Sequence, residues 1–238
     1  MEELFSVLFR QTIFIIEILA AFVGLKMYAR SNNKMIKLFA LFLLFIVIVE
    51  SIGHYVYLVD KGYMDFLVNT RFVRNYWLYN ISTPISFVFY IQFFIYFIKS
   101  KKVKSIANII VYVYGILALV NLLVTDVFFF SLSVFSYAVG SCLLFLLIIY
   151  YFYEILNDDT ILNFKQSFPF YVAIGVLVHH LLMAPLFIFS KYYIELDNPF
   201  FVLTYEIVLV VTNLFMYSCF IKAFLVHARN QELNKVES

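Results

Sequence analysis

Seven long apolar runs dominate this chain and constrain its fold more than any other feature. Each run is close to or longer than the ~20 residues that a helix needs to cross about 30 Å of hydrocarbon. Short polar connections separate the runs, so little of the 238-residue chain is left for a domain outside a membrane. The predicted spans are 5–28, 36–58, 76–98, 105–125, 128–153, 168–190 and 199–224.

Composition supports helices that face lipid. Hydrophobic residues make up 64% of the chain and charged residues only 13%, against roughly 25% charged residues in soluble domains. The apolar runs are continuous, as in 38–49 and 143–153, whereas the strands of outer-membrane barrels alternate apolar and polar residues. We therefore predict an all-α fold, a single seven-helix transmembrane domain over residues 1–238.

The basic residues predict an orientation for this bundle. Twelve of the seventeen Lys and Arg residues fall on one side of the predicted spans, in the connections after spans one, three and five and in the tail. Because basic residues concentrate in cytoplasmic loops, we expect the N-terminus outside and the C-terminus in the cytoplasm. The formal net charge of +2 is small and its basic residues are scattered, which excludes nucleic acid as a partner and leaves the lipid bilayer.

Polar side chains inside the spans are the candidate functional residues, because a buried ionisable group is costly in lipid and usually faces the bundle interior. Glu50 and His54 are four residues apart and share one helical face. With the predicted orientation, most such residues lie in the outer half, which predicts a pocket that opens outward and binds a ligand or a proton. The pocket candidates are Glu17, Glu50, His54, Asn80, His179, His180 and Glu206.

Two other readings of these residues stay open. Glu50 with His54, and Glu17 with Arg10, could be structural pairs that hold helices together, and His54 or Arg10 could pair with Glu206. Histidine and carboxylate side chains are also ligands for zinc or iron. The candidate metal ligands are Glu50, His54, His179 and Glu206. Our main expectation is nevertheless that the protein binds no cofactor, with zinc or haem as the lesser alternative.

Sequence motifs of known enzymes are absent. The chain has no P-loop, no GxSxG, no HExxH and no HxxxH, so enzymatic activity is not the main expectation. A retinal Schiff base is also not expected, because the lysine of the last span, Lys222, lies at its cytoplasmic end.

Three segments carry a resemblance to a known family. They are the basic connection 26–37, the third-span segment 79–87 and the last-span segment 212–217 with 223–225. In these segments the chain resembles a family of small, uncharacterised bacterial seven-helix membrane proteins rich in Phe and Tyr. The resemblance implies seven spans and a location in the bacterial cytoplasmic membrane, and it implies no particular activity.

These observations favour two functions over others. The first is a sensor or signalling subunit, whose outward pocket binds a ligand or proton and whose basic cytoplasmic connections contact a separate signalling partner. The alternative is a small transporter or channel in which Glu17, Glu50, His54 and Glu206 carry protons or a cation. A metal-dependent membrane enzyme is the third reading.

Overall fold

The computed structural model describes residues 2–157, 164–195 and 199–236, with side chains described for 11–157, 164–190 and 199–233. Seven of its helices are long and apolar enough to cross a membrane, which confirms the all-helical, multi-pass architecture for the described residues. The helices, in chain order, are α1 (Glu2–Tyr28), α2 (Lys34–Gly53), α3 (Tyr55–Asp60), η1 (Asp65–Leu67), α4 (Tyr76–Phe97), α5 (Lys101–Val124), α6 (Val127–Phe130), α7 (Val134–Leu156), α8 (Phe168–Glu195) and α9 (Pro199–Val236).

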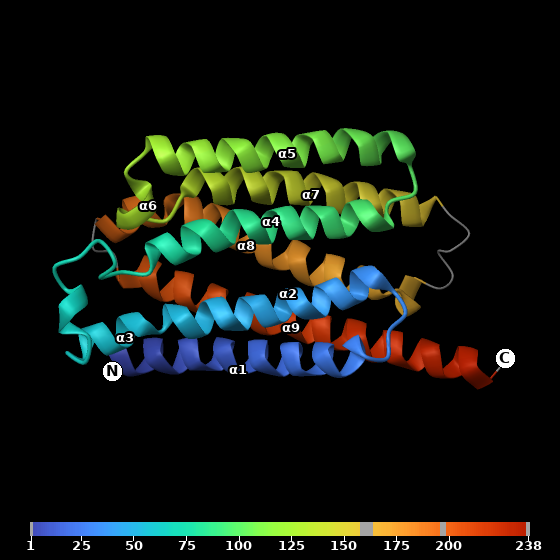
Figure 1. The fold of residues 1–238 in the computed structure, drawn as a ribbon, viewed down its shortest axis with the longest axis horizontal. Coiled ribbons are helices and arrows are strands. Elements are labelled where there is room, and N and C mark those ends of the chain that lie inside the picture. The colour runs from blue at the N-terminus through green and yellow to red at the C-terminus, as the bar shows by residue number, and fades with distance from the viewer. Residues whose placement is uncertain (1, 158–163, 196–198, 237–238) are drawn as a thin grey trace.

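The spanning helices run antiparallel to their neighbours along the chain, and the two termini lie at opposite ends of the bundle (Figure 1). One end, here called the N-terminal end, holds the N-terminus, α3 and α6. The other, the C-terminal end, holds the α1–α2 and α4–α5 connections and the last turns of α9. The α9 helix covers 38 residues, or about 57 Å at 1.5 Å per residue, and extends beyond the other helices at this end.

Helix contacts close six of the spans into a ring. The contacts run from α1 to α2, α4, α7, α8, α9 and back to α1, while α5 packs outside against α4 and α7. This arrangement explains why α4 is the most buried span and α5 is among the least buried. Because α1 and α9 lie side by side, the two ends of the chain complete one bundle.

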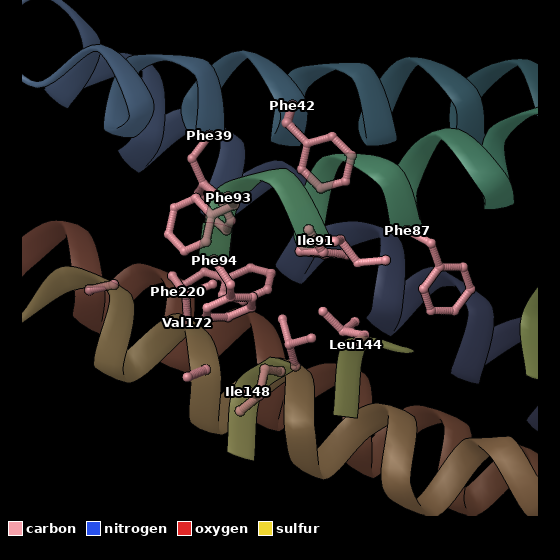
Figure 2. Packing of buried hydrophobic residues seen from close by; sticks show 14 of the residues in the cluster. Phe39, Phe42, Phe87, Ile91, Phe93, Phe94, Leu144, Ile148, Val172 and Phe220 are labelled. Carbon is pink, nitrogen blue, oxygen red and sulfur yellow. The ribbon is translucent and has the colours of Figure 1, made fainter. Parts of the chain in front are cut away.

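A cluster of phenylalanine rings fills the bundle toward its C-terminal end. The ring of Phe39 on α2 lies 5.1 Å from the rings of Phe93 and Phe220 and 5.6 Å from that of Phe168. Figure 2 shows Phe39, Phe93 and Phe220 gathered between their helices. We call Phe39, Phe93, Phe168, Phe220 and Phe224 the phenylalanine core, and all five rings are buried.

At the C-terminal end of the bundle, polar side chains form hydrogen bonds with backbone N–H groups where helices begin. Asn33 caps α2 by accepting hydrogen bonds from the N–H groups of Met35 and Ile36. The Glu154 carboxylate of α7 accepts from the N–H groups of Lys99 and Ser100, at 2.7 and 2.9 Å, just before α5 begins. These bonds satisfy backbone donors that a helix start leaves unpaired.

The fifth and the last of the predicted spans differ from the observed helices more than hydropathy leads one to expect. The predicted fifth span, 128–153, is divided: α6 ends at Phe130, and α7 begins only at Val134. The last helix continues past residue 224, because its polar C-terminal turns stay helical beyond the apolar stretch. Hydropathy detects the apolar stretch of a helix and not its backbone bonds, which explains both differences.

Candidate functional site

Two carboxyl groups lie within electrostatic reach of each other in the bundle. Glu17 on α1 is only 4% exposed, and its Oε2 atom has no hydrogen-bond partner among the described residues. Glu50 on α2 is close enough to interact with it electrostatically, and the Tyr217 hydroxyl on α9 lies near the Glu17 carboxyl. Burying an acidic oxygen that has no partner among the described residues costs free energy in a membrane. A bound proton, cation or ligand at this position would lower that cost.

Two tyrosines of α4, Tyr79 and Tyr90, complete the surroundings of these carboxyls. The Tyr79 hydroxyl donates to Oε2 of Glu50 at 2.8 Å. Tyr90, which is buried, lies near Glu17 and within 6.2 Å of the His180 ring, measured between ring centroids. We call Glu17, Glu50, Tyr79, Tyr90 and Tyr217 the carboxyl cluster. It draws on α1, α2, α4 and α9, which are all members of the closed ring.

A glycine allows Tyr79 to approach Glu50. A Cβ atom at Gly53 would lie 2.9 Å from the Tyr79 hydroxyl, closer than real Cβ contacts allow. Gly53 is also the last residue of α2, and its carbonyl accepts a hydrogen bond from the Asn75 side chain. The end of α2 is therefore shaped around the residues that hold Glu50.

His54 lies at the edge of this cluster and reaches the surface. Its Nδ1 atom is 2.6 Å from the backbone carbonyl of Glu50, and because a carbonyl only accepts, Nδ1 carries the hydrogen. The predicted Glu50–His54 neighbours thus touch through the backbone, and their side chains interact only electrostatically. His54 is exposed, separates α2 from α3, and packs its ring against Phe14 at 4.9 Å.

The two adjacent histidines of α8 point in different directions, as expected for neighbours on a helix. His179 is buried and its Nδ1 lies 3.0 Å from the Thr212 hydroxyl of α9. Thr212 donates its hydrogen to the Val208 carbonyl at 2.7 Å, so His179 is the donor in this contact. The ring of His180 lies among Phe87, Tyr90 and Tyr137, and its Nδ1 has no partner among the described residues.

Asn80 lies apart from the carboxyl cluster and has a structural role. Its side-chain NH₂ group lies within 3.1 Å of the carbonyls of Val127, Phe128 and Ser131, and its Oδ1 accepts from the N–H of Ser133 at 2.8 Å. These bonds hold the turn between α6 and α7, and they use the donors and the acceptor that a pocket ligand would need.

Glu206 and the predicted metal ligands are not brought together. Glu206 is partly exposed on α9 and forms no hydrogen bond or ion pair with the described side chains, while the Arg10 side chain lies outside them. Within the described part of the chain, no three His, Cys, Asp or Glu side chains are grouped closely enough to hold a metal ion. Glu50, His54, His179 and Glu206 are accordingly not gathered into such a group in the described structure.

The tyrosines of the cluster were not among the sequence-based candidates. Tyr79, Tyr90 and Tyr217 are three of 19 tyrosines, and nothing in their spacing separates them from those that face lipid. Their distinguishing signal is contact with a carboxyl group, which requires the positions of several helices at once.

No family model, no curated protein and no solved structure matches this chain at a significant level.

Proposed function

We propose that this protein is a sensor subunit of the bacterial cytoplasmic membrane, with its N-terminus outside and a separate signalling partner in or at the membrane. The carboxyl cluster is its sensing element. The observation that carries the proposal is the buried Glu17 carboxyl, with one unpartnered oxygen, beside a second carboxyl from another helix. Two negative charges so placed are costly in a low-dielectric interior, and a bound proton or small cation removes that cost.

The route to the cluster supports sensing from the N-terminal end of the bundle. Glu50 is partly exposed and His54 is exposed, so the polar groups continue from the surface to the buried Glu17. The titratable groups around the two carboxyls come from three helices and the end of α2. Glu50 of α2, Tyr90 of α4 and Tyr217 of α9 lie near Glu17, while Tyr79 of α4 and His54, just after α2, lie near Glu50. His179 and His180 of α8 lie beyond Tyr90.

The phenylalanine core favours signalling over transport. It fills the same ring of helices on the C-terminal side of the cluster, and its rings contact one another at 5.0 to 6.1 Å. A continuous polar path across the bundle is what a proton or cation would follow through a transporter. With this core in place, the energy of binding can instead shift helices, and the tightly packed rings would transmit that shift.

The C-terminal end of the bundle suits an output contact. Basic residues gather there on the connections between helices, and α9 extends beyond the bundle at the same end. The side chains of Ser31 and His227 form a hydrogen bond of 3.0 Å that joins the α1–α2 connection to this part of α9. A movement of α1 or α9 caused by binding at Glu17 or Tyr217 would therefore reach the surface offered to an acidic partner.

The test uses the single tryptophan as a native reporter. Trp77 precedes Tyr79 on α4 and donates a hydrogen bond to the Tyr55 hydroxyl at 3.2 Å. In protein reconstituted into nanodiscs, we expect Trp77 emission to change on going from mildly alkaline to mildly acidic pH. Glu17→Gln and Glu50→Gln should each remove most of this change, because a glutamine cannot gain the proton that rearranges the cluster.

Matched controls separate the cluster from other acids. Glu232→Gln alters an exposed carboxyl at the far end of α9 and should leave the Trp77 response intact, and so should Glu206→Gln, which lies outside the cluster. An emission that does not depend on pH, or a pH response that persists in the Glu17→Gln, Glu50→Gln double variant, would refute the sensing role of these two residues.

A small proton- or cation-coupled transporter is the second candidate, and the depth of the histidines favours it. His179 and His180 continue the polar groups from the carboxyl cluster into α8 through Tyr90. The discriminating measurement is proton uptake into liposomes that contain the purified protein. Uptake that Glu17→Gln abolishes would support transport, and the absence of flux together with a Trp77 response would support sensing.

A further inference from the structure

A groove of about 410 Å³ lies between α7 and α8, on a different side of the bundle from the carboxyl cluster. Its walls are apolar, with Leu144, Ile148 and Val176 buried at its base and Phe145, Leu181 and Ile188 exposed along its rim. Because these exposed residues belong to two membrane-spanning helices, the groove opens sideways toward the lipid. Its volume falls within the range of sites that bind small molecules.

Two residues of this groove carry buried polar atoms without a partner. Ser141 is 5% exposed, and its hydroxyl forms no hydrogen bond within the described structure. Nδ1 of His180, across the groove on α8, is likewise buried and unpaired among the described residues. Most buried hydroxyl and imidazole groups in proteins have a partner, and no water is at hand in the hydrocarbon to supply one.

The residues that line the groove also define the chemistry of an occupant. None of those that the structure assigns to it is Asp, Glu, Lys or Arg, so a phosphate or ammonium headgroup would be left without a counter-charge. A neutral hydroxyl or carbonyl, in contrast, can bond with Ser141 and His180, because both side chains can donate and accept. The apolar walls then fit an aliphatic body.

We infer that the α7–α8 groove is a binding site for a membrane-dissolved, uncharged amphipathic molecule, one with a long apolar body and a single hydroxyl or carbonyl group. The polar group lies at Ser141 and His180, and the apolar body lies along Phe145, Leu181 and Ile188. The molecule enters laterally from the bilayer. This site does not depend on the sensing role proposed above, although its occupant contacts His180, whose ring faces Tyr90 of the carboxyl cluster.

The experiment uses hexadecanol that carries a diazirine in its chain, and a matched diazirine hexadecane, with the full-length protein in nanodiscs. After irradiation, mass spectrometry locates the labelled peptides. We expect the alcohol to label peptides of α7 and α8, and unlabelled hexadecanol to compete where hexadecane does not. The Ser141→Ala, His180→Phe double variant should lower labelling by the alcohol about fivefold, as expected for the loss of a hydrogen bond.

Two further variants keep the result interpretable. Ser218→Ala changes an exposed serine of α9 and should leave labelling unchanged. Ala184→Phe adds a ring to the wall of the groove without removing a polar group, and it should reduce labelling by both probes even if the double variant fails to fold. Equal labelling by alcohol and alkane, unaffected by the double variant in folded protein, would show that lipid chains merely fill the groove and would overturn the inference.

Discussion

Gly140 of α7 packs against side chains of α4 and α5, and it can do so because it has no side chain of its own. A Cβ atom at this position would lie 2.5 Å from Cγ of Phe87 and 2.8 Å from the Tyr114 hydroxyl. Tyr114 in turn donates to the Ser136 carbonyl at 2.9 Å and is buried, so it cannot move aside without losing that bond. Phe87 also packs against His180, which ties this contact to the α7–α8 groove.

We therefore expect Gly140→Ala to destabilise the protein by about 1–3 kcal/mol, the usual cost of overpacking a filled interior. Gly115→Ala is the matched control, because nothing lies within 4 Å of a Cβ atom there. In a helix, alanine is favoured over glycine by ~0.5–1 kcal/mol, so this second change should be neutral or stabilising. Thermal unfolding of both variants in the same detergent provides the measurement, and equal unfolding temperatures would contradict the packing argument.

At the scale of elements, short polar networks decide where helices turn. The α6–α7 turn interrupts an apolar stretch that hydropathy treats as one span, and its backbone groups need partners. Asn80 supplies partners for four of them, while the Ser133 side chain caps α7 by accepting from the N–H of Ser136 at 3.1 Å. One asparagine on α4 thus positions two other elements.

Replacing this asparagine tests its structural role. Asn80→Ala leaves the Ser133 N–H and the carbonyls of the turn without their partner, and we expect a loss of about 1–3 kcal/mol in stability. Asn157→Ala is the control, since Asn157 is exposed and its side chain, among the described residues, bonds the Tyr153 carbonyl of its own helix. Thermal unfolding should separate the two, and the Trp77 response to pH should survive in folded Asn80→Ala protein, because Asn80 lies apart from the carboxyl cluster.

For the whole molecule, the arrangement of helices places the basic connections at one end. The α1–α2 and α4–α5 connections lie with the C-terminus, and α3 lies with the N-terminus at the opposite end (Figure 1). Together with the helix turns that flank them, these two connections hold eight of the Lys and Arg residues. The asymmetry that predicts orientation is therefore an asymmetry of the folded bundle. The bundle geometry alone does not say which end faces the cytoplasm, and the positive-inside bias carries that assignment.

Reporter fusions test the orientation directly. A reporter attached after Ser238 should be active in the form that requires the cytoplasm, and one inserted beside Lys61, in the connection after α3, should be active only in the form that requires the exterior. The opposite pattern would reverse the orientation, and it would place the exposed Glu50–His54 edge of the carboxyl cluster toward the cytoplasm.

The architecture was predictable from the sequence because hydropathy is a local property. Each of the seven spans meets its own length and composition requirement within about 20 consecutive residues, so no knowledge of its neighbours is needed. Glu17 and Glu50 could be selected in the same way, since a carboxyl inside a span is costly wherever its partner lies. The concentration of basic residues on one side of the spans, which predicts the cytoplasmic side, likewise follows from counting along the chain.

Only the tertiary structure could decide which polar residues meet. Tyr217 reaches Glu17 because α9 packs against α1, although 200 residues separate them in the chain. Asn80 turns to the α6–α7 backbone, Glu206 stays outside the cluster, and Ser141 and His180 line one groove that neither helix forms alone. Hydrophobicity determines that a segment enters the membrane, whereas the faces that helices present to one another are decided by side-chain packing across the whole bundle.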